Sequence, residues 1–360
     1  MFKQQEAKQK KANEKKAKQK LIVTANKVPF MAGGADYHIQ GLVDNLERHG
    51  HLVEMIRFPF RFSPESDIER LMAFCEGQNF NHPNGVSVDK VISLQFPSYG
   101  VAHDDHRVWI MHQHRAVYEL YEQQPQTNEL NQLRNQIIDF DNRVLSRASR
   151  LFANSGRVAE RLQHYNDLKA QPLYHPPHDA ERFYHADAYD YIFCPSRLER
   201  LKRQDLLIEA ARYLQTPTKI LIGGDGGQKE YYQGLIDQYE LGDRVRLMGR
   251  FTEEEKLALY ARSLGVFFAP FDEDYGYITL EAMLSEKPVI TCKDSGGPLE
   301  FVTHGENGFV NDPDPRQIAE SIDQIYNNRQ RSREMGREGK SRYIREEICW
   351  DKVVETLLAG

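Results

Sequence analysis

The sequence predicts an α/β protein with two domains, each a doubly wound parallel sheet. The chain has 360 residues, more than the roughly 250 to 300 at which one hydrophobic core stops growing. Short apolar runs alternate with helix-period segments in both halves, as expected for parallel sheets. Between the halves the apolar period stops and two prolines stand together, so we expect a hinge at 176–189.

The first half, 21–175, is predicted to be a Rossmann-like domain. The apolar runs that we interpret as its strands begin at Leu21, Leu52, Lys90, Arg107 and Arg150. A helix should follow the first strand, because apolar residues recur at i, i+3, i+4 and i+7. These residues are Ile39, Leu42, Val43 and Leu46.

The second half, 190–345, repeats the alternation as a second Rossmann-like domain. Its predicted strands begin at Tyr191, Lys219, Arg244, Leu264 and Lys287. The stretch 316–358 is predicted to be almost wholly helical, with Trp350, Val353, Val354 and Leu357 on one face. The last helix, 346–360, could pack back on the first domain. Two such domains would place a ligand cleft between them, at the carboxyl ends of their strands.

Composition excludes several classes of protein. The net charge of −6 provides no general attraction for nucleic acid. The four cysteines form no C-x-x-C pair, which fits reduced thiols in the cytoplasm. No apolar run approaches the roughly 20 residues that cross a bilayer.

Residues 1–20 carry eight lysines and two glutamates, which suggests a tail, or a linker from a larger protein. Contact of these lysines with the inner face of a membrane is an alternative.

The segment FDEDYGYITLEAM, residues 271–283, carries the clearest functional signal. Gly276 allows a close turn, and the helix that follows should point the free N–H groups of Gly276, Tyr277 and Ile278 at a ligand. A helix start with free N–H groups binds anions. This segment therefore predicts an anion site.

Two cations follow the strand that begins at Tyr191, namely Arg197 and Lys202. Together with the helix start they suit a diphosphate. Glu281 would be repelled by phosphate but could accept hydrogen bonds from a vicinal diol such as a ribose. Glu273, on the loop, would face a sugar beyond the phosphates.

These residues resemble the retaining glycosyltransferases of family 4, which have the GT-B fold. Glu273 and Glu281 match the E-x7-E signature of that family, and segments such as PSRLERLKRQDLLIEAARYL and SEKPVITCKDSGGPLEFVTHGENGFV occur in the expected order. The resemblance covers roughly 21–358. It implies two Rossmann-like domains facing across a cleft, an N-terminal one for the acceptor and a C-terminal one for a nucleotide-sugar donor.

The resemblance also implies residue roles. Arg197 and Lys202 match the pair that binds the donor diphosphate, Glu281 the residue that holds the ribose, and Glu273 the residue that contacts the transferred sugar. Gly33 and Gly34 match a glycine loop that faces the phosphates and the acceptor. An active-site histidine is expected after the strand that begins at Arg107, and both His112 and His114 are candidates.

Each candidate also has a plain structural interpretation. Arg197 and Lys202 could be surface charges, Glu281 an early-helix acid stabilised by the dipole, and either histidine a bystander. The GGDGG segment, 223–227, is most simply a tight turn, and Phe251 could stack on a base or belong to the core.

A metal-dependent transferase is a competing interpretation. Asp272 and Asp274 spell D-x-D, and HDDH at 103–106 resembles a metal cluster. We expect no metal, because Arg197, Lys202 and the helix start already supply positive charge for a diphosphate.

The predicted function is a retaining hexosyltransferase that moves a sugar from a nucleotide diphosphate to a hydroxyl of a glycan or glycolipid. The resemblance suggests a role in surface polysaccharide or lipopolysaccharide synthesis, in the cytoplasm or at the inner face of the membrane. No cofactor is expected beyond the nucleotide-sugar co-substrate. The alternatives are a sugar phosphorylase or sugar-phosphate synthase on the same fold, or a non-catalytic nucleotide-sugar binding module of a larger protein.

Overall fold

The computed structural model describes residues 18–30 and 33–359 and divides into two compact units. Unit 1 runs to His175 and includes the segment from Cys349 onwards, whereas unit 2 is Pro176–Ile348. The segment 176–189, predicted as a hinge, is thus grouped with unit 2. Residues 1–17 of the lysine-rich segment lie outside the described residues.

Unit 1 is built on a six-stranded parallel sheet with strand order β2-β1-β3-β4-β5-β6. Its direction of winding reverses between β1 and β3, where the carboxyl ends of two adjacent strands open a site for ligands. The strands are β1 (Lys20–Lys27), β2 (Leu52–Pro59), β3 (Lys90–Ser93), β4 (His106–Ile110), β5 (Arg150–Ala153) and β6 (Gln171–Pro172).

Hydrophobic clusters line both faces of this sheet. Along β4, Trp109 packs with one cluster and Val108 and Ile110 with the other, because successive strand side chains point to opposite faces. The helices are α2 (Gly34–Arg48), α3 (Glu65–Glu76), α4 (Asn128–Leu145), α5 (Gly156–Asn166) and α12 (Trp350–Leu358), with 3₁₀ turns η1 (Pro83–Gly85), η2 (Ser98–Gly100), η3 (Arg115–Val117) and η4 (Tyr121–Gln123). The predicted apolar face of α2 is buried.

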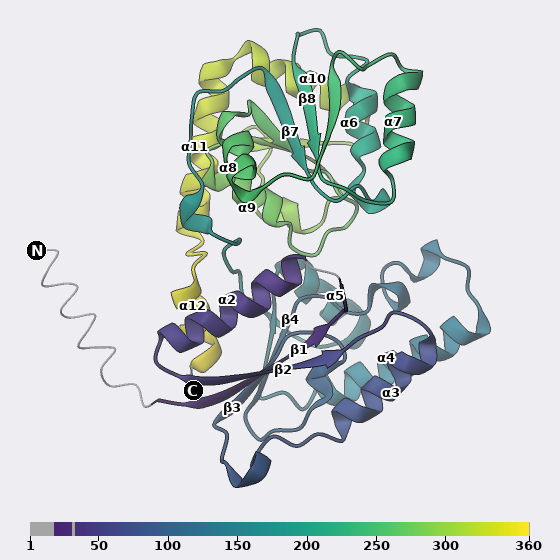
Figure 1. Cartoon of the computed structure of the whole chain (residues 1–360), viewed down its shortest axis with the longest axis vertical. Coiled ribbons are helices and arrows are strands. Elements are labelled where there is room, and N and C mark those ends of the chain that lie inside the picture. Colours follow the sequence, from purple (N-terminus) through teal and green to yellow (C-terminus); the bar gives the residue numbers. More distant parts are fainter. Residues whose placement is uncertain (1–17, 31–32, 360) are drawn as a thin grey trace, which may run out of the picture. The chain divides into compact units, whose positions relative to one another are not determined.

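The C-terminal helix α12 packs against α2 in unit 1 (Figure 1). Val353, Val354 and Leu357 are buried there. A Cβ atom at Gly41 of α2 would lie 2.3 Å from the Trp350 ring, so only glycine admits this tryptophan.

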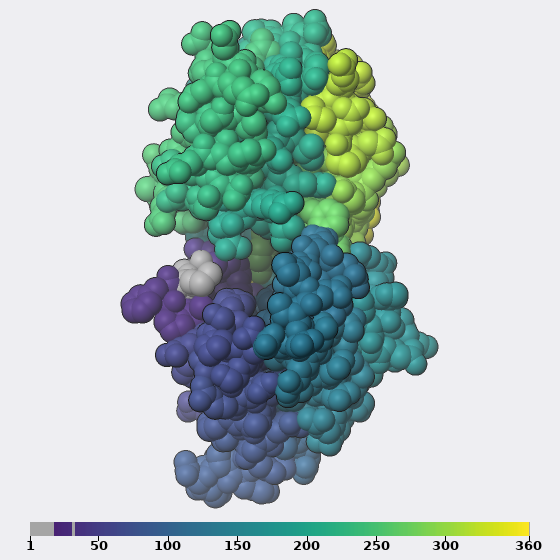
Figure 2. Space-filling view, turned by 90° about the vertical axis from the view of Figure 1, so that its right-hand side faces the viewer, coloured from purple at the N-terminus to yellow at the C-terminus, as the bar shows by residue number. Residues whose placement is uncertain are grey.

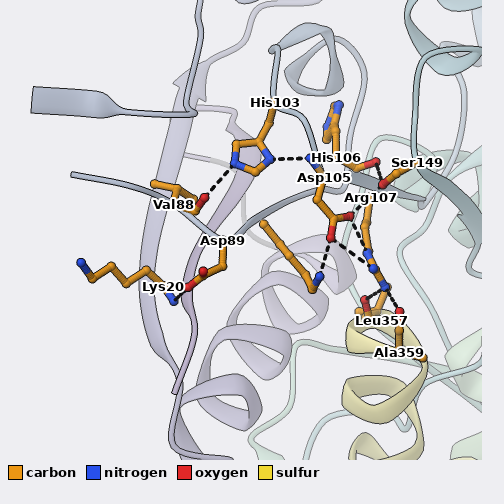
Figure 3. A network of polar contacts seen from close by, with 11 residues as sticks. Lys20, Val88, Asp89, His103, Asp105, His106, Arg107, Ser149, Leu357 and Ala359 are labelled. Atoms are coloured by element: carbon orange, nitrogen blue, oxygen red, sulfur yellow. Dashed lines mark hydrogen bonds and ion pairs between the residues drawn. The ribbon is translucent and has the colours of Figure 1, made fainter. Parts of the chain in front are cut away.

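Arg107 fixes the end of α12 by donating to the carbonyl oxygens of Leu357, at 2.7 Å, and Ala359 (Figure 3). Asp105 in turn accepts from Arg107, from Lys90 and from Ser149. Two residues of the HDDH segment therefore have structural roles. Asp105 anchors Arg107, and the neighbouring His106 contacts the hydroxyl of Ser93 at 2.7 Å.

Unit 2 contains the second six-stranded parallel sheet, with strand order β12-β11-β10-β7-β8-β9. Here winding reverses between β7 and β10. The strands are β7 (Tyr191–Pro195), β8 (Lys219–Gly223), β9 (Val245–Gly249), β10 (Gly265–Phe267), β11 (Val289–Cys292) and β12 (Gly308–Asn311).

In unit 2, α6 and α7 lie on one side of the sheet and α8 and α9 on the other (Figure 1). Although α10 and α6 are far apart in the sequence, they pack side by side, and their segments adjoin at the surface (Figure 2). The helices are α6 (Gln204–Ala210), α7 (Lys229–Gln238), α8 (Glu253–Arg262), α9 (Tyr277–Leu284), α10 (Pro315–Asn327) and α11 (Arg329–Arg345), with 3₁₀ turns η5 (Ala180–Arg182), η6 (Arg200–Lys202) and η7 (Gly297–Glu300).

The structure confirms the predicted fold class of two doubly wound parallel sheets. Two strands, β6 and β12, were not predicted. Among the described helices, none combines the length and apolar character needed to span a membrane.

Candidate functional site

The reversal point of the unit 2 sheet gathers most of the predicted site residues. Because β7 and β10 are neighbours, the loops after their carboxyl ends meet at one edge of the sheet. The loop after β7 carries Arg197 and Lys202, and the loop after β10 carries Glu273 and Gly276. The two loops are joined where the N–H of Phe271 donates to the carbonyl oxygen of Leu201 at 2.8 Å.

Lys202 and Glu273 form an ion pair across these loops. The Nζ atom of Lys202 donates to Oε2 of Glu273 at 2.6 Å, and both side chains are largely but not fully buried, at 16% and 20% exposed. The ammonium also lies 5.7 Å from the centre of the Phe268 ring. An ammonium has three N–H donors and a carboxylate about four acceptor positions, so both groups keep capacity for a ligand.

Glu281 is held inside unit 2 by two residues of α8. The hydroxyl of Tyr260 donates to Oε2 of Glu281 at 2.5 Å, and the Nζ atom of Lys256 lies 3.6 Å from Oε1. Burial, and then the charge of Glu281, raises the pKa of Tyr260 well above its usual value, which keeps that hydroxyl a donor. The Oε1 atom therefore retains acceptor capacity for a ligand hydroxyl.

The start of α9 has the geometry expected for an anion site. Gly276 is its N-cap, with φ 87°, a left-handed conformation that glycine adopts without strain. A Cβ atom there would lie 3.0 Å from the Phe268 ring and 3.1 Å from Pro298. No acidic residue occupies the first turn, so the N–H groups of Tyr277 and Ile278 begin the helix without a competing carboxylate from that turn.

The glycine-rich segment 223–227 buttresses the loop that carries Arg197. A Cβ atom on Gly224, at φ +132°, would lie 2.0 Å from the carbonyl oxygen of Ser196, and one on Gly226 would lie 2.5 Å from that of Leu198. The glycines are therefore needed for close backbone packing. Arg197 itself is exposed, and its guanidinium has no hydrogen bond or ion pair to the residues that the structure describes.

Arg203 is a structural residue of the site that the sequence did not reveal. Its guanidinium makes a bidentate pair with Asp294, with two distances of 2.7 Å, and donates to the carbonyl oxygens of Ala269 and Pro270. It thereby ties the loop after β7 to the loops after β10 and β11. The last basic residue in RLERLKR was the available signal, but its partner lies 91 residues away.

Glycines also join the loops after β10 and β11. Glu273 pairs with Gly296 in an isolated parallel bridge, and a Cβ atom on Gly296 would lie 2.5 Å from the carbonyl oxygen of Glu273. The segment DSGGPLE thus positions Glu273.

The two segments considered as metal sites, D-x-D and HDDH, do not form such a site. Within the described residues, neither belongs to a group of three or more His, Cys, Asp or Glu side chains that could hold a metal ion.

Phe251 lies half-buried behind the site. Its ring centre is 6.0 Å from that of Phe193, and a Cβ atom on Gly223 would come within 2.5 Å of it. The Phe251 ring therefore serves at least in part as a packing residue. Stacking on a base stays a prediction.

In unit 1, Gly33 and Gly34 follow β1, at the reversal point of that sheet. Gly33 is the N-cap of α2 and its N–H donates to Asp36 at 3.3 Å. Asp36 in turn accepts from Arg57 at 2.7 Å. The start of α2 is therefore already occupied in part by a carboxylate.

The two candidate histidines follow β4 in unit 1 but differ in environment. His112 is half-buried, with Nδ1 at 2.9 Å from the carbonyl oxygen of Gln113. His114 packs against Phe96 and Phe60, with ring centres 5.4 and 6.5 Å away. Burial, and then the proximity of His112, lowers the pKa of His114 to about 4, so His114 is a neutral imidazole at pH 7.

Comparisons with known proteins bear on residues 179–342, which match the family model described as Glycosyl transferases group 1. The chain is 29% identical over 178 residues to the alpha-1,3/1,6-mannosyltransferase ALG2 of Homo sapiens, covering 45% of this chain and 42% of that protein. The chain thus spans less than half the length of this curated relative.

Solved structures show the same fold over nearly the whole chain. A sucrose-phosphate synthase from Thermosynechococcus elongatus superposes with a TM-score of 0.73 at 18% identity, covering 94% of this chain and 97% of that one. The Anabaena protein HepE, in complex with UDP and glucose, superposes with a TM-score of 0.69 at 18% identity, covering 95% and 100%. These neighbours have the GT-B fold, as expected from the sequence.

Proposed function

Because residues 179–342 match the family model described as Glycosyl transferases group 1, we propose that the chain is a retaining glycosyltransferase. It transfers a sugar from a nucleotide diphosphate to a hydroxyl of a glycan or glycolipid acceptor. The proposed setting is surface polysaccharide or lipopolysaccharide synthesis, in the cytoplasm or at the inner face of the membrane. ALG2 is named a mannosyltransferase and HepE was solved with UDP and glucose, which supports a nucleotide-sugar donor.

The observation that carries this proposal is the 2.6 Å contact between Lys202 and Glu273. A cation suited to phosphate and a carboxylate suited to sugar hydroxyls stand side by side at the reversal point of one sheet. A sugar diphosphate presents its groups in the matching order, because its sugar, suited to Glu273, is bonded directly to the outer phosphate, suited to Lys202. Glu281, farther inside, would then accept hydrogen bonds from the ribose through Oε1.

Catalysis would depend on stabilising the departing diphosphate. Breaking the bond between the anomeric carbon and phosphate oxygen leaves negative charge on the diphosphate and an oxocarbenium-like sugar. Lys202, Arg197 and the N–H groups at the start of α9 would stabilise that charge, and loss of one such donor typically slows turnover 10²- to 10³-fold. The acceptor hydroxyl would attack the face from which the diphosphate leaves and would give its proton to the departing phosphate oxygen. A catalytic role for His112 or His114 of unit 1 is likewise proposed.

The proposal includes no metal ion, because these groups already supply positive charge to the diphosphate. Donor turnover in excess EDTA tests this point. Sustained turnover supports the metal-free mechanism, whereas loss of activity that magnesium or manganese restores would contradict it.

Lys202→Met tests the leaving-group role. We expect kcat to fall by about 10²- to 10³-fold, with a smaller change in the Kd of the nucleotide diphosphate, in assays that screen UDP-, GDP- and ADP-sugars. Lys219→Met is the matched control, because Lys219 is an exposed lysine of the same unit that donates to the carbonyl of Asp243. Equal turnover in the two variants would contradict the proposed role of Lys202.

The alternative functions are tested by the choice of acceptor. Free phosphate and sugar phosphates, offered as acceptors in the same assays, distinguish a phosphorylase or a sugar-phosphate synthase from a glycosyltransferase.

A further inference from the structure

Unit 2 contains a pocket at the edge of its sheet opposite to the proposed donor site. The pocket has an empty volume of about 420 Å³, including solvent at its mouth. Ser263 and Leu264 reach it just before β10, and Lys287 and Pro288 just before β11. These residues precede the amino ends of the strands, whereas Lys202 and Glu273 follow carboxyl ends. The pocket is therefore separate from the proposed donor site.

The ammonium group of Lys287 lies in the lining of this pocket and has few hydrogen-bond acceptors and no paired carboxylate among the described residues. The residue is only 2% exposed, and its Nζ atom makes one hydrogen bond, to the carbonyl oxygen of Ala186 at 3.1 Å. No carboxylate lies within ion-pair distance of Nζ among the described residues. A buried ammonium has three donors and is costly without acceptors, so two donors are available to a ligand.

Three further basic side chains line the same pocket: His185, Arg329 and Arg333. Arg329 and Arg333 stand in the first turns of α11. Arg329 pairs with Asp190 at 2.6 Å, and Arg333 makes a longer contact of 3.3 Å with Asp187, whose side chain is 91% exposed. The second pair is exposed and long, so it should exchange readily for a better acceptor.

The acidic residues at the pocket do not neutralise Lys287. Glu286 lines it but is paired with Lys340 at 2.9 Å. Burial lowers the pKa of Lys287 to about 8, with Glu286 and Asp187 raising it and Arg333 lowering it. The side chain is thus still mainly protonated at pH 7. With Lys287 protonated and Lys340 counted, the four cations Lys287, Arg329, Arg333 and Lys340 exceed the three carboxylates of Glu286, Asp187 and Asp190 by one positive charge.

We infer that this pocket is a binding site for a phosphate group, with Lys287 at its base and Arg333 at its rim. A phosphate oxygen would accept from the free donors of Lys287, and the guanidinium of Arg333 would exchange the exposed Asp187 for a second phosphate oxygen. Guanidinium groups match phosphate in geometry. Inorganic phosphate and a phosphate monoester share the recognised group. The inference does not depend on transferase activity.

Calorimetric titration with inorganic phosphate tests the site, using the full chain. The protein in every titration also carries the substitutions Lys202→Met and Arg197→Gln, which remove the cations of the proposed donor site. In this background we expect saturable binding, and Lys287→Met should weaken it at least tenfold. Lys219→Met in the same background is the control and should leave the Kd unchanged.

Arg333→Gln, at the exposed rim, keeps the test decisive if Lys287→Met does not fold, and it should weaken binding at least threefold. A parallel titration with glycerol phosphate distinguishes the sources, since tighter binding than inorganic phosphate would identify a phosphate monoester as the ligand. Absence of saturable binding in the background variant, or an unchanged Kd on replacement of Lys287 and of Arg333, would overturn the inference.

Discussion

Replacing Tyr260 by phenylalanine removes one oxygen from the support of Glu281. Tyr260 is fully buried and donates to Oε2 of Glu281 at 2.5 Å. The phenylalanine would keep the ring contacts with Phe193 and Phe183, whose centres lie 5.2 and 5.6 Å away. Glu281, only 9% exposed, would then be left with Lys256, at 3.6 Å from its other oxygen.

The expected loss follows from the charge and burial of this pair. A hydrogen bond to a charged group contributes about 1.5–3 kcal/mol, and the site has little access to water that could replace the hydroxyl. We therefore expect the free energy of unfolding of unit 2 to fall by about 1.5–3 kcal/mol. Affinity for a nucleoside diphosphate should also fall, by about tenfold for each 1.4 kcal/mol that is lost from donor binding.

Urea unfolding and calorimetry measure the two effects. Both tryptophans of the chain, Trp109 and Trp350, belong to unit 1, so tryptophan fluorescence reports unit 1 and far-UV circular dichroism reports both units. The Tyr260→Phe variant should shift the dichroism transition to lower urea and leave the fluorescence transition in place. The control is Tyr232→Phe, because the hydroxyl of the buried Tyr232 contacts backbone groups of Glu199 and Gln204 rather than a carboxylate. If the two variants match in stability and in donor affinity, Tyr260 does not support Glu281.

Two further predictions concern acid stability and a close backbone contact. The rings of His38 and His175 stack at 3.8 Å inside unit 1, and burial lowers the pKa of His38 to about 3 and that of His175 well below its usual value. The unfolded chain takes up these protons below about pH 6.5. The free energy of unfolding should therefore be at its full value above that pH and should fall below it, by up to about 1.4 kcal/mol per pH unit for each histidine. A urea midpoint, detected by fluorescence, that stays constant from pH 6.5 to 5 would contradict this. Gly224→Ala should destabilise unit 2 by at least about 2 kcal/mol, because the new Cβ atom would lie 2.0 Å from the carbonyl oxygen of Ser196; the dichroism transition measures it, and a wild-type midpoint would refute the contact.

The sequence was sufficient for elements with a strong local pattern. The strands that begin near Leu21 and Tyr191 and the apolar face of α2 are continuous or periodic runs, and the structure contains them as predicted. Strand β6 has only two residues, Gln171 and Pro172, and β12 is the short segment GFVN. Both lie at sheet edges, where pairing with one neighbour, rather than a long apolar run, defines the strand.

The position of a candidate site residue was predictable where that residue follows a strand, whereas its supporting contacts were not. Lys202 and Glu273 each stand in a loop after a predicted strand, and the adjacency of β7 and β10 brings them together. The contact of Tyr260 with Glu281 joins two helices, and the pair of Arg203 with Asp294 spans 91 residues. Such contacts depend on tertiary packing and leave no local pattern.

A structure of the chain with a bound nucleoside diphosphate tests the central claim most directly. We predict the outer phosphate beside Nζ of Lys202 and the N–H groups of Tyr277 and Ile278, and the ribose hydroxyls at Oε1 of Glu281. A nucleotide bound elsewhere on unit 2, or phosphates joined to the protein only through a divalent cation, would contradict it.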